Sequence, residues 1–421
     1  MTATALPRKV GAGGAALLSF NGAVGAAVFA LPATLNADVG PWAALLFPAA
    51  ALVMLLIAIP FAKAIAAMPG EGGPVVYGSA FGRFAGFELG WTYYIARMAA
   101  FAANVHVLVD YLLRWTDIAP QPWLRSALIL AVIALLAAIN IAGTTRALRL
   151  LGGLTLLKSL PLVALAALAL VVTPLPAFGA PPPLTAIEAS ILLVFYAFIG
   201  FENSVAVSGE ARDGGRAIAR AMLATIFLVA LLYFLVQLAF SAVSPPIEAG
   251  EKAPLLALGT ALLGPTGALL ILLAAVTSLL GNLHANMTAS PRVSHALAAR
   301  GDLPSWAAAV HPRFLTPAGS ILLMAAIVAA LALSGGFVWL AVVSTLARMA
   351  VYAVTIAAWL KIARRSRREI GLGLTGILLC LGVSTQASAA AWATLGALLL
   401  AGLLLFLLAR RARQQPLERI E

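Results

Sequence analysis

The sequence has little charge and almost no cysteine. Only 10% of its 421 residues are charged, whereas a soluble domain carries about 25%. The single cysteine, Cys380, lies in an apolar run, which excludes a disulfide framework and a cysteine metal site. The four histidines lack the HExxH or any similar ligand spacing, and no glycine-rich phosphate-binding loop is found. The sequence therefore gives no sign of a metal or of a cofactor.

Apolar residues dominate instead. They make up 62% of the chain, and the mean hydropathy is +1.02. Because about 20 apolar residues cross a bilayer, we expect an all-α polytopic membrane protein with twelve transmembrane helices. The first is expected to be retained, since no AxA-like cleavage site follows it. The expected spans are Gly13–Leu35, Ala43–Met68, Gly86–Leu113, Trp123–Ile141, Gly152–Val172, Thr185–Val207, Ile218–Ala242, Thr266–Ala289, Pro317–Leu333, Phe337–Ile362, Gly371–Gln386 and Ala389–Ala409.

The basic residues are unevenly placed between these spans. With a cytoplasmic N-terminus, 21 of the 27 fall in inner segments, and only Arg114, Arg125 and Lys252 fall outside. This bias follows the positive-inside rule and predicts cytoplasmic termini at both ends. Nucleic-acid binding is disfavoured despite the net charge of +12, because no basic run is interleaved with aromatics. The alanine-rich composition is typical of a GC-rich bacterial genome, so we expect the bacterial cytoplasmic (inner) membrane.

Two spans are interrupted at corresponding places. The first carries glycines within residues 21–29, and the sixth carries Gly200 two residues before Glu202. A carboxylate inside the bilayer has a high free-energy cost and by default indicates a functional site. Glycine-broken spans at matching positions are typical of a transporter site at an inverted repeat. Glycine also permits close helix packing, but that alternative is less favoured for this pair.

Four stretches, in this order within the twelve spans, resemble the amino acid–polyamine–organocation (APC) transporter superfamily. They are Val28-Phe29-Ala30-Leu31-Pro32; Pro69-Gly70-Glu71-Gly72-Gly73-Pro74-Val75-Val76-Tyr77 with Phe81-Gly82; Phe198-Ile199-Gly200-Phe201-Glu202 with Glu210; and Ser290-Pro291-Arg292-Val293 through Arg300-Gly301-Asp302-Leu303-Pro304 with His311-Pro312. The likeness covers spans one to ten.

This resemblance implies one transporter domain, residues 1–421, built as a five-plus-five inverted repeat. The first repeat is expected over residues 13–172 and the inverted second repeat over 185–362. Spans eleven and twelve, over 371–409, are expected to be peripheral and offer the natural contact for a homodimer. Residues 410–421 form a basic cytoplasmic tail in this scheme.

The resemblance also implies where an amino acid binds. Its carboxylate would meet backbone N–H groups of span one and its ammonium the carbonyls of spans one and six, since helix termini present unpaired donors and acceptors. Gly25-Ala26-Ala27 stands where the family usually has Gly-Ser-Gly, so the amides remain but added methyl groups crowd the pocket. The substrate-binding candidates are Asn21, Gly22, Ala23, Gly25, Ala26, Ala27, Phe195, Tyr196, Phe198, Ile199 and Gly200.

Several side chains within the spans are candidates for coupling and gating. Lys158 either extends to the cytoplasmic surface or takes the place of a sodium ion between spans one, five and eight, as in family members that use protons. Glu202 either carries a proton or balances a charge, and Tyr196 is either a gate or a core aromatic. The coupling and gating candidates are Lys158, Glu202, Tyr196, Arg97 and Ser278.

Other polar residues within the spans have open roles. Arg97 and Arg348 are expected either to pair with Glu202 or to line an anion-facing surface. Four further residues are candidates for the wall of the site, and a packing role is favoured for the two histidines among them. They are Asn104, His106, Asn282 and His284.

These expectations converge on transport. The deep ionisable groups are mostly cationic, which favours neutral amino acids, then acidic ones, over dicationic substrates. We expect secondary active transport by alternating access, coupled to protons or to exchange and independent of sodium. The alternatives are a polyamine, cationic or acidic amino acid antiporter, and a nutrient sensor that kept the fold. A membrane-embedded hydrolase would need a nucleophile–base pair or metal cluster at span depth, and the sequence offers none.

Overall fold

The computed structural model describes residues 12–68, 73–116, 121–143, 147–203, 214–247, 250–362 and 365–414. Within these ranges the chain is helical, with no strand. The α-helices are α1 (Ala12–Ala23), α2 (Ala26–Val39), α3 (Ala43–Ala67), α4 (Pro74–Gly78), α5 (Arg83–Thr116), α6 (Pro122–Ile141), α7 (Ala147–Val172), α8 (Leu184–Tyr196), α9 (Gly214–Val243), α10 (Pro254–Ala299), α11 (Ala318–Ser334), α12 (Phe337–Ile362), α13 (Arg367–Ser384) and α14 (Ala389–Gln414). Short 3-10 helices are η1 (Gly40–Trp42), η2 (Ser79–Phe81) and η4 (Ser305–Ala308).

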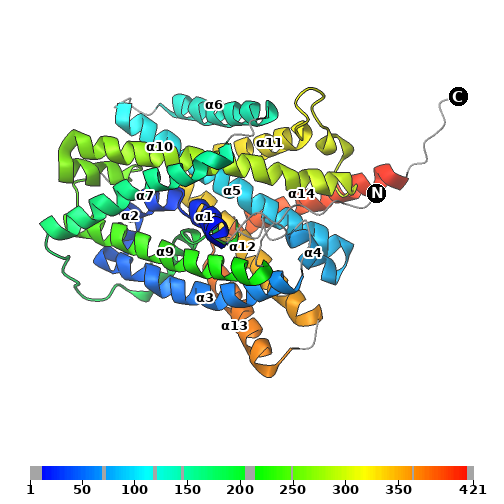
Figure 1. Ribbon diagram of the computed structural model, residues 1–421, viewed down its shortest axis with the longest axis horizontal. Coiled ribbons are helices and arrows are strands. Elements are labelled where there is room, and N and C mark those ends of the chain that lie inside the picture. Colours follow the sequence, from blue (N-terminus) through cyan, green and yellow to red (C-terminus); the bar gives the residue numbers. More distant parts are fainter. Residues whose placement is uncertain are drawn as a thin grey trace.

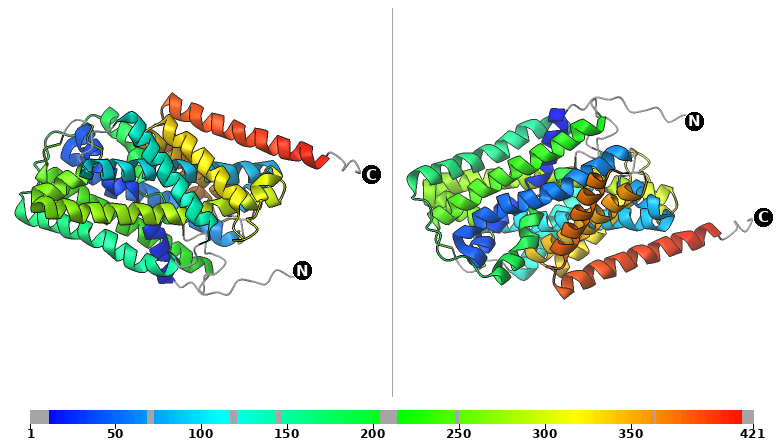
Figure 2. Two further views of the ribbon diagram at one scale, coloured as in Figure 1. Left: turned by 90° about the horizontal axis from the view of Figure 1, so that it is seen from above. Right: turned by 90° about the horizontal axis from the view of Figure 1, so that it is seen from below.

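The helices form a bundle whose centre is occupied by the short helix α1 and the long helix α5. Figure 1 shows α1 near the middle, and it packs against α7, α9 and α10. Helix α5 packs against α10 and α12, and its most apolar stretch is 83% buried, against 22% for α14. In both views of Figure 2, α14 runs along the outside of the bundle. The centre is therefore built from α1, α5, α10 and α12.

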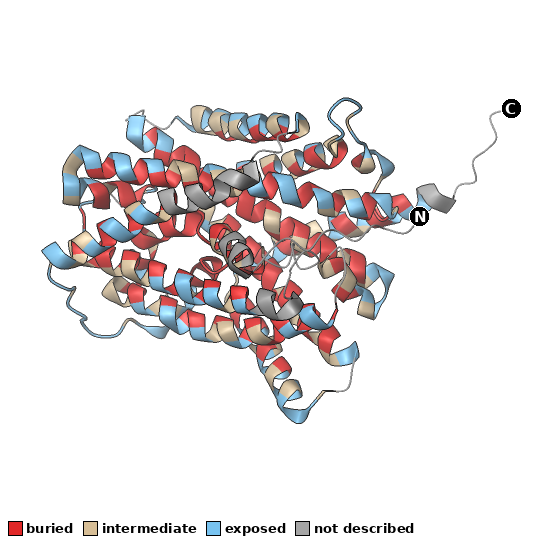
Figure 3. Ribbon diagram, in the orientation of Figure 1, coloured by how far each residue is buried: buried red, intermediate tan, exposed pale blue. Residues whose placement is uncertain are grey.

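The described residues contain eight helical stretches that are long and apolar enough to cross a membrane. Two shorter apolar helices, over 158–172 and 318–334, accompany them. The protein is thus a polytopic helical chain, while the count of twelve spans stays a prediction. The outward faces of α6 and α14 are exposed (Figure 3) and carry large apolar side chains such as Leu135, Leu400 and Leu404. A contiguous apolar exterior of this kind fits a lipid-facing surface.

Two helices differ from the expected span boundaries. The long part of α10 begins after a kink at Leu263 and Gly264, close to the start expected at Thr266, and a short helix from Pro254 precedes the kink. It also continues through Pro291 to Ala299, where the sequence predicted an end at Ala289. A proline removes only the one backbone hydrogen bond that its own N–H would donate, and membrane helices tolerate this loss where neighbouring helices pack against them. Within the continuing helix, Ser294 Oγ donates to the Pro291 carbonyl at 3.1 Å.

The sixth expected span also ends differently. Helix α8 stops at Tyr196 and gives way to turns and a short 3-10 segment up to Asn203. The basic residues Arg216 and Arg220 that follow this span belong to α9, which begins at Gly214. The rest of the span, Glu210 and Arg212 lie outside the described residues. So do residues 69–72 of the second motif and the last seven residues of the tail.

Candidate functional site

The first helix interruption lies between α1 and α2. Helix α1 ends at Ala23, and α2 begins at Ala26 after Gly25, whose φ of −127° and ψ of −137° are not helical. Such a break strands the carbonyls that end one helix and the amides that begin the next. The stranded groups are buried, so each requires a partner.

The second interruption, after α8, touches the first. Gly200 has a φ of +111°, a conformation that favours glycine, and a Cβ there would overlap the backbone of Gly22 and Ala23. A Cβ at Gly22 would in turn overlap the side-chain amide of Asn203. The two broken segments therefore meet backbone to backbone, and both glycines are required for that approach.

Lys158 supplies partners for the stranded carbonyls of the first break. Its side chain extends inward from α7, is 1% exposed, and donates to Asn21 O at 3.0 Å and to Val24 O at 2.9 Å. Ser278 Oγ, from α10, donates to the same Val24 carbonyl at 3.0 Å. Lysine, serine and carbonyls thus form one cluster where the first, fifth and eighth expected spans meet. In this geometry the ammonium points into the bundle rather than to the surface.

Glu202 lies in a buried ion pair with Arg348 of α12. The Arg348 Nε lies 3.0 Å from Glu202 Oε1, with side chains 4% and 2% exposed. Glu202 Oε2 accepts a hydrogen bond from Gly200 N at 2.9 Å, and Arg348 Nη1 donates to Ala96 O of α5 at 2.9 Å. The pair therefore connects the second break to α5 and α12. Of the two arginines considered from the sequence, Arg348 is the partner of Glu202.

Arg97 of α5 has only neutral partners among the described residues. Its Nε donates to Ser290 Oγ at 2.6 Å, and its Nη1 donates to Tyr93 OH at 3.2 Å and to Asn203 Oδ1 at 3.3 Å. The guanidinium also lies 5.7 Å from the centre of the Tyr93 ring, a cation–π contact. The Asn203 side chain, to which Arg97 donates, lies directly against Gly22, so only this side chain separates the guanidinium from the first break.

Two asparagines complete the first break. The Ala26 amide donates to Asn104 Oδ1 of α5 at 3.0 Å, and Asn282 Nδ2 of α10 donates to Gly22 O at 3.0 Å. Tyr233 OH of α9 donates to Ala23 O at 3.3 Å. The sequence indicated both asparagines as wall residues, but Tyr233 was missed because a tyrosine in an apolar span carries no distinguishing signal.

The binding candidates predicted from the sequence fall into two groups that the fold brings together. The first group lies at the first break and consists of Asn21, Gly22, Ala23, Gly25, Ala26 and Ala27. The second group lies at the end of α8 and just after it, and consists of Phe195, Tyr196, Phe198, Ile199 and Gly200. All eleven are buried except Gly22, which is partly exposed. Tyr196 packs edge-to-face on Phe337 of α12, with ring centres 5.8 Å apart.

The histidines are held by structural contacts. His106 faces Ala332 O through Nε2 at 2.9 Å and Arg125 Nη2 through Nδ1 at 2.7 Å, and Arg125 also pairs with Asp110 at 2.8 Å. This cluster joins α5, α6 and α11. His284 lies 3.5 Å from the amide nitrogen of Asn140. Asp110 was missed from the sequence, although its place four residues after His106 in an apolar run is a usable signal.

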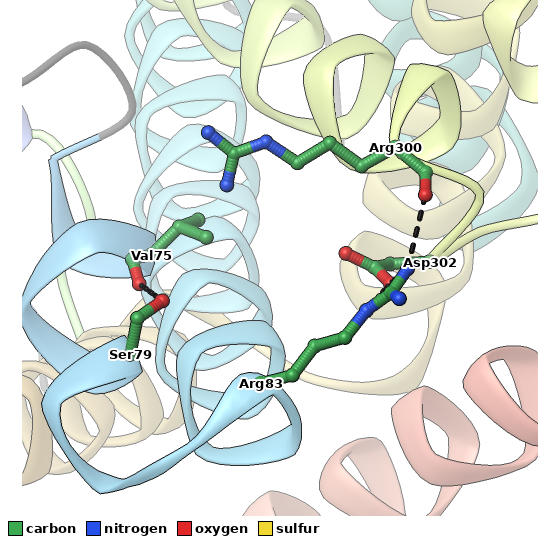
Figure 4. Close-up of a pocket in the computed structure, with 5 residues that line it drawn as sticks. All are labelled: Val75, Ser79, Arg83, Arg300 and Asp302. Atoms are coloured by element: carbon green, nitrogen blue, oxygen red, sulfur yellow. Dashed lines mark hydrogen bonds and ion pairs between the residues drawn. The ribbon is translucent and has the colours of Figure 1, made fainter.

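A separate hollow of about 290 Å³ joins the second and fourth motifs. Figure 4 shows Arg83, at the start of α5, reaching Asp302 beyond the end of α10. The Arg83 Nη2 lies 2.8 Å from Asp302 Oδ1 and 3.1 Å from the Arg300 carbonyl. At this place the second and fourth motifs lie together, and the Arg83–Asp302 ion pair links the start of α5 to the end of α10.

Discontinuous helices whose freed backbone groups are bonded by side chains of neighbouring helices, inside an apolar bundle, are typical of membrane transporters. The chain belongs to the amino acid permease family, whose model matches residues 13–416. The protein is therefore a multi-pass membrane transporter and not an enzyme.

Its relatives agree with this assignment. Uncharacterized transporters of Mycobacterium bovis and Mycobacterium tuberculosis are 30% identical to this chain, over 97% of its length and 94% of theirs. A serine/threonine exchanger of Bacillus subtilis is 31% identical over 31% of this chain and 30% of its own length. A vacuolar cationic amino acid transporter of Arabidopsis thaliana is 25% identical over 38% of this chain and 26% of its own length.

Proposed function

We propose that the protein is a secondary active transporter that moves amino acids, most readily neutral ones, across a bacterial cytoplasmic membrane by alternating access. In this proposal it crosses the membrane twelve times with both termini in the cytoplasm. The first ten spans form a five-plus-five inverted repeat, with interruptions in the first and the sixth. Residues 13–172 and 185–362 are the two repeats, and the substrate binds where the interruptions meet.

The observation that carries the proposal is the position of Lys158. Its ammonium bonds to two stranded carbonyls, Asn21 O and Val24 O, beside the Ser278 hydroxyl. Carbonyl and hydroxyl oxygens are ligands that a metal cation such as sodium would take, and here a protein cation holds them. A buried lysine can gain and lose a proton during a cycle. This arrangement supports proton coupling without sodium.

The charges around the site support a neutral substrate. Glu202 is neutralised by Arg348, whereas Arg97 and Lys158 bond only to neutral partners in the described part of the chain, so the basic groups outnumber the acidic one. A second positive charge on the substrate would add to this excess. The pairing of Glu202 also supports charge balance, rather than proton carriage, as its role.

Uptake into proteoliposomes tests the proposal. With a panel of labelled amino acids, we expect saturable uptake that an imposed inward proton gradient increases and that replacement of sodium by potassium leaves unchanged. Lys158→Gln keeps donors for the carbonyls but cannot exchange a proton, so gradient-driven accumulation should fall at least about tenfold. Lys252→Ala, at an exposed lysine, is the control and should transport normally.

Three outcomes would contradict parts of this proposal. Gradient-driven accumulation that survives in Lys158→Gln removes the coupling role, and a strict requirement for sodium removes it as well. Saturable binding without flux would favour a nutrient sensor.

Exchange is the second candidate mechanism, favoured by the likeness to a serine/threonine exchanger. Preloading the vesicles with an unlabelled amino acid separates the two mechanisms. Uptake that needs an internal amino acid and ignores the proton gradient indicates exchange.

A further inference from the structure

Two asparagine side chains converge on the first helix break from opposite sides. Asn104 comes from α5 and Asn282 from α10. A Cβ on Gly25 would lie 2.9 Å from Asn104 Oδ1 and 3.4 Å from Asn282 Nδ2. Both side chains therefore end within van der Waals reach of the same glycine.

Each asparagine bonds to a backbone group of the kind that an amino acid would use. Asn104 Oδ1 accepts from the Ala26 amide at the start of α2, which is where a carboxylate would bind. Asn282 Nδ2 donates to the Gly22 carbonyl near the end of α1, which is where an ammonium would bind. One side chain presents an oxygen and the other an N–H donor, as the two ends of a zwitterion do.

The two side chains are held with different firmness. Asn104 is 4% exposed, and its own Nδ2 donates to Ala100 O at 2.7 Å, which orients Oδ1 towards Ala26. Asn282 is only partly buried, and the bond to Gly22 is its one side-chain hydrogen bond within the described residues. Displacing Asn282 therefore breaks fewer contacts than displacing Asn104.

We infer that Asn104 and Asn282 are internal stand-ins for the carboxylate and the ammonium of the substrate. They satisfy the broken helix while the site is empty, and the substrate displaces them when it binds. This inference rests on the proposed function, because it places the amino acid at the break between α1 and α2. It makes the two asparagines determinants of specificity in addition to wall residues.

The exchange favours a ligand that carries both charges. Hydrogen bonds to charged groups are roughly twice as strong as those between neutral groups, so a carboxylate displaces Asn104 and an ammonium displaces Asn282. A ligand with only one of these groups displaces one asparagine and leaves the other in place. Only a zwitterion would therefore displace both asparagines from the backbone of the break.

Ligand binding to the purified full-length protein tests the inference. The probes are the tightest-binding of the twenty standard amino acids, its decarboxylated amine and its deaminated acid; for L-alanine these are ethylamine and propionate. Since a net hydrogen bond corresponds to a factor of about 3 to 10, Asn104→Ala should bind the amino acid and the acid that much more tightly and leave the amine unchanged. Asn282→Ala should tighten binding of the amino acid and the amine and leave the acid unchanged.

Two further variants guard against misfolding and general loosening. Asn104→Ser is too short to reach Ala26, yet its hydroxyl can bond the Ala100 carbonyl within its own helix, so it should behave like Asn104→Ala. Asn140→Ala is the matched control, because Asn140 is also buried and also donates to the carbonyl four residues earlier, away from the break. Its affinities should equal those of the wild type.

The outcomes separate the inference from the proposed function. Weaker amino acid binding by Asn104→Ala and Asn104→Ser would overturn the inference, because it would make Asn104 a direct ligand. Equal effects on the acid and the amine would overturn it too. Failure of the wild-type protein to bind any of the twenty amino acids would overturn the proposed function and the inference together.

Discussion

At the scale of single residues, two kinds of interaction organise the interior: hydrogen bonds from side chains to the backbone of the first break, and an ion pair between two buried side chains. Lys158, Ser278 and Asn282 bond to carbonyls of the first break. Glu202 and Arg348 neutralise each other, and Glu202 also holds the Gly200 amide. Because the Glu202 and Arg348 side chains are almost fully buried, removal of one leaves the charge of the other in an environment without water.

The Glu202–Arg348 pair yields a prediction about stability. Glu202→Gln keeps an acceptor for Gly200 N but leaves the Arg348 charge unpaired, so we expect a loss of about 3–5 kcal/mol of unfolding free energy. Arg348→Met should cost a similar amount because it strands Glu202. The double variant should be markedly more stable than the sum of the single losses predicts.

Thermal unfolding of the detergent-solubilised variants measures these effects in a double-mutant cycle. Lys63→Met is a suitable control, because Lys63 forms a surface ion pair with Glu369 at 3.4 Å, and such exposed pairs contribute about 0–1 kcal/mol. Additive losses from Glu202→Gln and Arg348→Met would show that the two residues do not depend on each other.

At the scale of elements, the site exists because two helices stop in the middle of the bundle. Helix α1 ends at Ala23 and α8 at Tyr196, and the backbones meet at Gly22 and Gly200. The neighbouring helices α5, α7, α9 and α10 each send at least one side chain to the first break. The break is thus held by four elements, which keeps its unpaired backbone in a defined geometry.

Gly200 should not tolerate any side chain. Gly200→Ala places a methyl group against the backbone of Gly22 in a left-handed conformation, and the strained backbone alone costs about 1–3 kcal/mol. We expect a lower unfolding temperature and loss of transport. Fluorescence-detected unfolding and proteoliposome uptake measure both.

Gly396→Ala is the matched control for this variant, since a Cβ at Gly396 in α14 meets nothing within 4 Å. It should leave uptake unchanged and should not lower stability, because alanine is the better helix former. Wild-type behaviour of Gly200→Ala would show that the two breaks separate by more than the structure indicates.

At the scale of the whole molecule, buried and exposed faces divide the helices into a core and a periphery. Helix α5 is enclosed, whereas α14 runs along the outside of the bundle and is covered over little of its surface (Figure 2). The exposed leucines of α14 face outward without protein partners, as the lipid-facing side of a membrane helix does. The charge bias of the loops then sets which end of the bundle faces the cytoplasm.

The predicted orientation can be measured with introduced cysteines, because Cys380 is the single native cysteine and is 1% exposed. In a Cys380→Ser background, Lys252→Cys should react with a membrane-impermeant maleimide in intact cells. Arg313→Cys should react only after permeabilisation. Both positions are exposed at the surface of the bundle, so reversed labelling would mean that the orientation is inverted.

The helical class and the place of the two breaks follow from the sequence. Long apolar runs of about 20 residues have few solutions in a membrane other than helices, and Gly25 and Gly200 mark where two of them are interrupted. Boundaries were less predictable where a proline lies inside a helix. The span expected over Thr266–Ala289 ends before Pro291, yet α10 continues through this proline to Ala299, because the loss of one backbone hydrogen bond does not by itself end a membrane helix.

Only the tertiary structure decided which side chains meet. The sequence left Arg97 and Arg348 equal as partners of Glu202, and the packing of α12 against α5 and α8 selected Arg348. Asn104 and Ala26 are 78 residues apart, and Asn282 and Gly22 are 260 apart. No local pattern encodes such contacts, because they depend on how whole helices rotate and pack. The apolar runs and their glycines therefore determine a membrane-spanning helical chain with two helix breaks. The packing of the other helices around these breaks turns them into a site.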